Sequence, residues 1–101
     1  MDVNASSRDR LLTLYLKGDL DHHGATGLMD RLDREIDAAL PLRLVLDMES
    51  VGFMDSSGIA VVMRCRRRMR ELGGAVEVRG VNAQARKVLD AAGIDRFVTV
   101  R

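Results

Sequence analysis

The sequence is poor in the residues that build disulfides, tight turns and aromatic pockets. Of its 101 residues one is cysteine, one is proline, none is tryptophan, and 3% are aromatic. The single cysteine excludes a disulfide within the chain, and the scarce aromatics leave little material for an enzyme's substrate pocket. The first residues lack the charged and apolar regions of a secretory signal, so we expect a cytoplasmic protein.

An excess of charge of one sign is also missing. Sixteen basic residues stand against fifteen acidic ones, which leaves a formal net charge of +1, well short of a typical nucleic-acid-binding domain. No apolar run approaches the roughly 20 residues that a helix needs to cross a bilayer. The sequence therefore predicts one soluble domain over residues 1–101, with no direct nucleic-acid partner and no membrane association.

Apolar periodicity predicts an alternation of strands and helices. The expected strands lie around residue 3 and at 12–16, 42–48, 75–79 and 97–100, and the expected helices at 25–39, 57–72 and 83–92. Helical crossovers require parallel pairing of the strands that they join, while a turn at residues 6–9 adds an antiparallel N-terminal edge strand. The fold class is α/β, with a mixed, mostly parallel sheet of four to five strands. The nearly continuous apolar run at 42–48 predicts a central strand that is covered on both faces.

A short motif stands between the central strand and the helix expected at 57–72. Its sequence is Phe-Met-Asp-Ser-Ser-Gly at residues 53–58, which places the hydroxyls of Ser56 and Ser57 at a helix start. Unpaired backbone N–H groups and the positive end of the helix dipole favour an anion there. This position suits a serine that becomes phosphorylated. The alternative is that Asp55, Ser56 or Ser57 only caps the helix.

The helix that follows this motif has two sides. The side expected to face the sheet carries Gly58, Val61, Val62, Cys65, Met69 and Leu72. A second line contains Ser56, Ile59, Met63, Arg67 and Arg70, and we interpret it as a stripe on which a partner docks. The alternative is that Ile59 and Met63 pack against a neighbouring helix.

Five arginines on the same helix raise the question of nucleic-acid binding. They are Arg64, Arg66, Arg67, Arg68 and Arg70. Nucleic acid is the weaker interpretation, because no aromatic side chain is interleaved with them. In addition, Glu35 and Glu71 are available as counter-charges.

A second polar segment, residues 18–23, leaves the strand expected at 12–16. Because the carboxyl ends of parallel strands meet at one edge of a sheet, we expect Asp21 to lie close to Asp55 and Ser56. The alternative is that Asp21 caps the first helix.

Ser56, a histidine (His22 or His23) and an aspartate (Asp21 or Asp55) are the residue types of a hydrolytic triad. The Gly-x-Ser-x-Gly turn that presents the serine in many hydrolases is absent, however, so we expect that the protein is not an enzyme. Adjacent histidines also have the wrong spacing to share a metal ion, so we expect no metal and no cofactor.

These two segments together resemble the STAS-domain anti-sigma factor antagonists of bacteria. The similarity rests on Gly-Asp-Leu-Asp-His-His at residues 18–23, on Phe-Met-Asp-Ser-Ser-Gly-Ile at residues 53–59 and on the region 81–94. It spans nearly the whole chain. Mild departures are Asp19, where glutamate is usual, and Ile59, where leucine is common. Relatives often continue into a further helix after the last strand. Either this is a short member of the family or that helix lies outside this sequence, in which case part of the sheet would be exposed.

The resemblance implies a regulatory role. Ser56 matches the family's phosphoacceptor, and the unmodified protein is expected to bind an anti-sigma factor, a serine kinase of ATPase fold, and so free a sigma factor. A serine phosphatase would remove the phosphate. The expected partner-binding residues are Asp21, His22, Met54, Asp55, Ser57, Gly58, Ile59, Met63 and Arg67. The alternative is a STAS scaffold or transporter-associated subunit in which Ser56 is a plain cap.

Overall fold

A computed structural model describes all 101 residues and contains a five-stranded sheet in the order β1-β2-β3-β4-β5. β1 pairs antiparallel with β2, whereas every other neighbouring pair is parallel. The mixed, mostly parallel sheet with a central third strand is therefore confirmed. The strands are β1 (Asp2–Arg8), β2 (Leu11–Leu20), β3 (Arg43–Met54), β4 (Ala75–Arg79) and β5 (Thr99–Val100).

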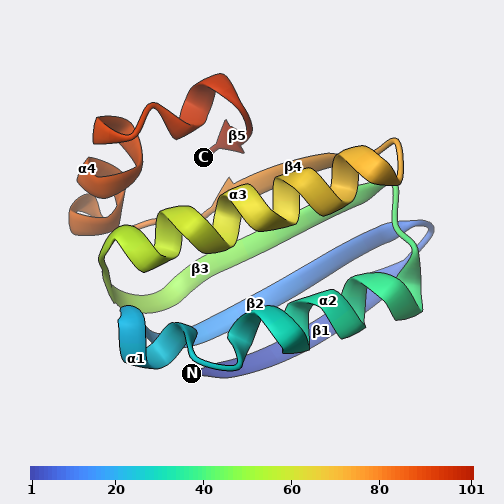
Figure 1. Ribbon diagram of the computed structural model, residues 1–101, viewed down its shortest axis with the longest axis horizontal. Coiled ribbons are helices and arrows are strands. Elements are labelled where there is room, and N and C mark those ends of the chain that lie inside the picture. Colours follow the sequence, from blue (N-terminus) through green and yellow to red (C-terminus); the bar gives the residue numbers. More distant parts are fainter.

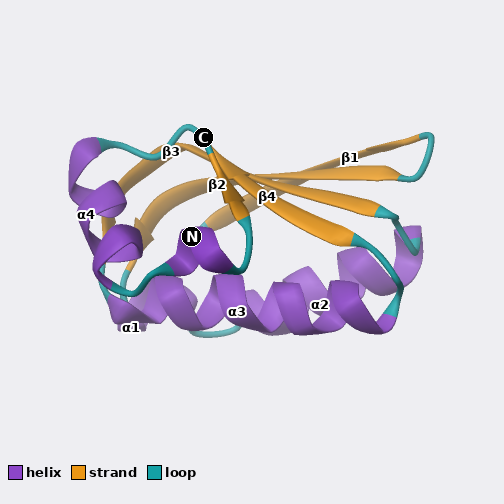
Figure 2. Ribbon diagram, turned by 90° about the horizontal axis from the view of Figure 1, so that it is seen from above, coloured by secondary structure: helices purple, strands orange, loops and turns teal.

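The helices cover only one face of this sheet. They are α1 (His22–Ala25), α2 (Leu28–Ala39), α3 (Ser56–Glu71), α4 (Ala83–Ala91) and the 3-10 helix η1 (Ile94–Arg96). Figures 1 and 2 show α1, α2 and α3 lying along one face, and α4 beside the end of β3. The expectation that the central strand is covered on both faces is wrong. No helix is long and apolar enough to span a bilayer.

The burial pattern of β3 explains why the sequence was misleading here. Alternate residues Leu44, Leu46 and Met48 belong to the core beneath the helices, as the two-residue period of a strand requires. Val45 and Asp47 point to the helix-free face, yet they are only 3% and 8% exposed. Both are flanked on β2 and β4 by paired residues, Thr13 and Glu77 for Val45 and Tyr15 and Arg79 for Asp47. The Asp47 carboxylate accepts a hydrogen bond of 2.9 Å from Arg79. A continuous buried run thus arises without a second layer of helices.

The N-terminal hairpin is longer than predicted and turns later. β1 pairs with β2 from Asp2–Lys17 to Arg8–Leu11, so the turn consists of Asp9 and Arg10 rather than residues 6–9. Both have positive φ angles, 53° and 64°, as a two-residue turn of type I′ requires. The predicted turn was placed too early because neither residue is the glycine that usually marks such a turn.

The ends of the longer helices agree with the sequence. Asp55 caps α3, and Asn82 caps α4 by accepting a hydrogen bond of 2.8 Å from the Ala85 N–H. Gly73 and Gly93 have the positive φ expected after a helix. The first helix differs, because it is divided into α1 and α2 by Gly27, whose φ is +76°. The strand expected at 97–100 is reduced to two residues.

Ion pairs join α2 to α3, although not through the predicted carboxylates. Arg64 pairs with Asp33 at 3.2 Å and Arg68 with Asp37 at 2.7 Å. Glu35 instead pairs with Arg31 on its own helix. Glu35 is thus not a counter-charge for α3. Glu71 does lie among the arginines of α3, where the hydrogen bond to Asp37 raises the pKa of Arg68 and the charge of Glu71 adds a smaller effect in the same direction. The helical spacing of α2 turns its aspartates, rather than Glu35, toward α3.

Candidate functional site

The carboxyl ends of β2 and β3 meet at one edge of the sheet. Leu20 and Met54 are paired residues at the ends of these parallel strands, and the Asp55 N–H donates a 3.2 Å hydrogen bond to the Leu20 carbonyl. The residue after each strand is an aspartate, Asp21 on one side and Asp55 on the other. The juxtaposition predicted from the sequence is therefore present, and it brings the starts of α1 and α3 together.

Both aspartates cap the helices that they precede. The carboxylate of Asp21 accepts a 2.7 Å hydrogen bond from the Gly24 N–H, and that of Asp55 accepts one of 2.7 Å from the Ser57 N–H. The Ser57 N–H holds the pKa of Asp55 below its ordinary value, with a smaller contribution from His22, because each favours the ionised carboxylate. Capping thus also fixes a negative charge at this edge.

Ser56 is the first residue of α3, and its side chain is exposed. It follows Asp55 directly, so its hydroxyl lies next to a capped carboxylate at the positive end of a 16-residue helix. His22 is also exposed, in the first turn of α1. An anionic group on Ser56 would meet the helix dipole on one side and solvent on the other.

Two of the predicted partner-binding residues lie beneath this edge rather than on it. Met54 is fully buried, and Gly58 is buried directly above it. A Cβ atom added at Gly58 would lie 2.5 Å from Met54 Cγ and 2.7 Å from its Sδ. Gly58 therefore allows the first turn of α3 to approach β3. Neither residue therefore presents a surface to a partner directly.

The predicted docking stripe is only partly exposed. Ile59 and Met63 are half-buried and pack against the core, whereas Arg67 is exposed. Cys65 lies on the buried side, as predicted, and burial raises its pKa to about 12. No cluster of three or more His, Cys, Asp or Glu side chains is arranged to hold a metal ion.

Comparison of the sequence with known proteins identifies the family of this domain. A family model described as "STAS domain" matches residues 2–101. The chain belongs to the STAS domain family. It is 29% identical over 90 residues to an "Anti-sigma F factor antagonist" of Paenibacillus polymyxa, a match that covers 89% of this chain and 77% of the relative.

Solved structures share the fold of this STAS domain. The anti-sigma factor antagonist SpoIIAA in its unphosphorylated form superimposes with a TM-score of 0.82 at 22% identity, over 99% of this chain and 88% of that one. The Bacillus cell fate determinant SpoIIAA in the phosphorylated form gives a TM-score of 0.73 at 22% identity, over 99% and 91% of the two chains. At 22% identity, these two comparisons show a shared fold and do not by themselves show a shared function.

Two residues at this edge of the STAS domain were not predicted as site residues from the sequence. Phe53 is 44% exposed, although it lies one residue from the fully buried Met54; strand alternation was the signal that predicts it to point outward. Gln84 of α4 hydrogen-bonds both backbone groups of Met54, accepting from its N–H at 2.9 Å and donating to its carbonyl at 2.6 Å. No local pattern marks a glutamine that pairs with a strand 30 residues away.

Proposed function

We propose that this STAS domain is an anti-sigma factor antagonist controlled by phosphorylation of Ser56. In its unmodified form it binds an anti-sigma factor, a serine kinase of ATPase fold, and thereby frees a sigma factor. Phosphorylation releases the anti-sigma factor, and a serine phosphatase resets the cycle. The names of the relatives support this role, and so does the fold shared with SpoIIAA, a protein solved in unphosphorylated and phosphorylated forms.

The observation that carries the proposal is an exposed hydroxyl at the start of α3, beside Asp55 and at the same edge as Asp21. In the transfer, the bond between the γ-phosphorus of ATP and the β,γ-bridging oxygen breaks while Ser56 Oγ bonds to that phosphorus. The hydroxyl proton passes to a base of the kinase, and ADP leaves. The exposure of Ser56 permits this approach without unfolding of α3.

The same geometry explains how a phosphate changes binding without changing the fold. A phosphoserine adds a charge of about −1.5 to −2, and the dipole of α3 stabilises that charge by about 0.3 to 1 kcal/mol. Against a bound partner, however, the phosphate adds to the carboxylates of Asp21 and Asp55 in a partly desolvated interface. Repulsion there is on the order of a few kcal/mol at an effective dielectric constant of about 20, which corresponds to about a hundredfold or more in affinity.

Intact-mass measurement tests the modification. The protein is incubated with Mg²⁺-ATP and the candidate anti-sigma factor, and the wild type is expected to gain the mass of one phosphate. Ser7→Ala, at an exposed position of β1, keeps the acceptor and should gain it as well, whereas Ser56→Ala should not. A wild type that stays unlabelled beside an active kinase would favour the scaffold or transporter-associated role instead.

Binding measurements test the switch. Isothermal titration calorimetry with the anti-sigma factor should give Ser56→Ala the affinity of the wild type. Ser56→Asp should bind about tenfold or more weakly, because its carboxylate is a partial substitute for the phosphate. Equal affinities for Ser56→Ala and Ser56→Asp would contradict electrostatic release.

A further inference from the structure

The arginines of α3 are not equivalent. Arg64 and Arg68 are engaged with α2 through the ion pairs to Asp33 and Asp37. Arg67 and Arg70 are exposed, and neither has a carboxylate within ion-pair distance. Arg66 donates from Nε to the Phe97 carbonyl at 3.3 Å. Intramolecular contacts therefore account for three of the five guanidinium groups and leave two on the surface without a carboxylate partner.

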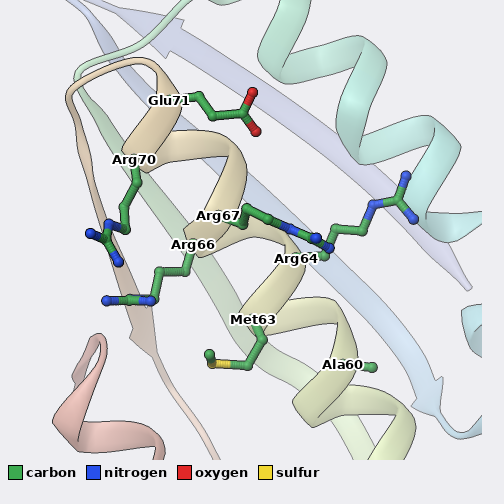
Figure 3. Close-up of a pocket in the computed structure, with 7 residues that line it drawn as sticks. All are labelled: Ala60, Met63, Arg64, Arg66, Arg67, Arg70 and Glu71. Atoms are coloured by element: carbon green, nitrogen blue, oxygen red, sulfur yellow. The ribbon is translucent and has the colours of Figure 1, made fainter.

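The unpaired arginines line a hollow on the outer side of α3. Its volume is about 770 Å³, and of its seven lining residues four are arginine and one is glutamate. Figure 3 shows Arg66 and Arg70 extending to one flank of the helix, toward the C-terminal segment, and Arg64 and Arg67 extending to the other. Met63 and Ala60 supply the apolar part. The hollow is thus positively charged at its sides and apolar at the end nearer the start of α3.

A second hollow continues this surface toward the C-terminus. It measures about 780 Å³, shares Arg66 and Arg70 with the first, and is lined by aliphatic residues, among them Val76 and Val100. Two cations lie over the Phe97 ring, with the guanidinium carbon of Arg66 at 5.0 Å and that of Arg96 at 5.4 Å from its centroid. An aromatic side chain therefore does accompany the arginines, contrary to the reading from sequence, because the fold brings it in from another segment. We call the two hollows together the arginine groove.

The ligand chemistry follows from this lining. Unpaired guanidinium groups favour carboxylates, which they can bind in a bidentate fork, and the aliphatic lining residues favour apolar side chains. Nucleic acid fits less well. The ring that would stack on a base is already engaged by two guanidinium groups, and the aliphatic side chains of the second hollow offer no polar partner to a sugar-phosphate backbone.

We infer that the arginine groove binds an acidic, amphipathic segment of a partner protein. Carboxylates of that segment pair with Arg67 and Arg70, and its apolar side chains lie against Met63 and the aliphatic residues of the second hollow. The inference concerns the side of α3 beyond Ala60, one helical turn from Ser56, and does not depend on phosphorylation.

A peptide titration tests this site on the full chain. The probe is a synthetic peptide of about twelve residues with glutamate and leucine at helical spacing, long enough to follow α3 from Ala60 to Glu71. Its control replaces every glutamate with glutamine. Amide shifts of the isotope-labelled protein are expected to change at residues 60–71 and 97–100 with the acidic peptide alone. Raising the ionic strength from about 0.05 to about 0.5 M should weaken binding several-fold.

Matched variants locate the charges responsible. Arg67→Gln with Arg70→Gln removes both unpaired cations and should weaken peptide binding about tenfold. Arg34→Gln with Lys87→Gln makes the same change of net charge at two exposed positions outside the groove, and should bind as the wild type does. Thermal melting confirms that both double variants are folded.

Three results would overturn the inference. The first is an absence of amide shifts in the groove at millimolar peptide, and the second is equal loss of binding in the two double variants. The third is a single-stranded oligonucleotide of similar length that shifts the groove amides at lower concentration than the peptide, since this would assign the groove to nucleic acid. Loss of Ser56 labelling in the kinase assay would leave the groove unaffected, so the two proposals fail separately.

Discussion

Single residues at the start of α3 determine how the candidate phosphoacceptor is presented. Asp55 holds the first turn through the Ser57 N–H, and Gly58 lets that turn lie against Met54. The Asp55 cap thus lies just before Ser56 in the chain, and the contact of Gly58 with Met54 lies just after it. Because both contacts are local, few atoms determine the position of the Ser56 hydroxyl.

Replacing Gly58 with alanine should destabilise the protein. The new Cβ would lie 2.5 Å from Cγ of a fully buried methionine, and a forced shift in a packed core costs about 1 to 3 kcal/mol. Urea unfolding measures the change. Gly52→Ala is the matched control, because its Cβ would meet only a side-chain oxygen of Asp19 at 3.4 Å. A midpoint for Gly58→Ala equal to that of Gly52→Ala would show that Met54 adapts freely.

Contacts between elements hold the end of β3 in place. α4 packs beside this end (Figure 1), and the Gln84 amide pairs with the N–H and the carbonyl of Met54. The side-chain amide of Asn82 also donates to the Gly52 carbonyl at 3.1 Å. The segment before Ser56 is therefore clamped by a helix that follows it in sequence by about thirty residues.

Gln84→Met should loosen this clamp without leaving a cavity. It keeps the side-chain volume but removes both hydrogen bonds, so two backbone groups of a buried residue lose their partners at a cost of about 1 to 3 kcal/mol. Hydrogen exchange of the Met54 amide should accelerate accordingly. Lys87→Met, at an exposed position on the same helix, controls for the introduced methionine. Unchanged exchange at Met54 would mean that water replaces the glutamine.

The elements that the sequence predicted well are those whose signals are local. The ends of α3 and α4 follow from Asp55, Asn82 and the glycines after each helix, since capping depends on neighbouring residues. The hairpin turn was missed because Asp9 and Arg10 take positive φ without a glycine. The division of the first helix was missed because the apolar spacing continues across Gly27, whereas its backbone conformation interrupts the helix.

Features that depend on the packing of the whole molecule were harder to predict from the sequence. The edge that joins Asp21, Asp55 and Ser56 was predictable, because parallel strands bring their carboxyl ends together. The absence of helices on the second face was not, since Val45 and Asp47 are buried by neighbouring side chains on that face. Pairings between distant segments, such as Gln84 with Met54 and Arg66 with Phe97, depend on the final packing and leave no pattern along the chain.

The reactivity of Cys65 measures whether α3 separates from the sheet only when the whole domain unfolds. It is the only cysteine, it is fully buried in the core beneath α3, and burial raises its pKa to about 12. The thiolate is the reactive form, so at neutral pH the native thiol should be inert toward a disulfide reagent. Its labelling should be limited by global unfolding, with a rate that rises with urea as the unfolded population does.

The control places a cysteine at the exposed position 60 in a Cys65→Ala background, which should react at the rate of a free thiol. If Cys65 in the wild type reacted equally fast without denaturant, α3 would have to separate locally from the sheet. Such opening would also release Gly58 from Met54 and Asp55 from Leu20. Protection of Cys65 until global unfolding would therefore show that α3 stays on the sheet in the native state, with Ser56 held at its first turn.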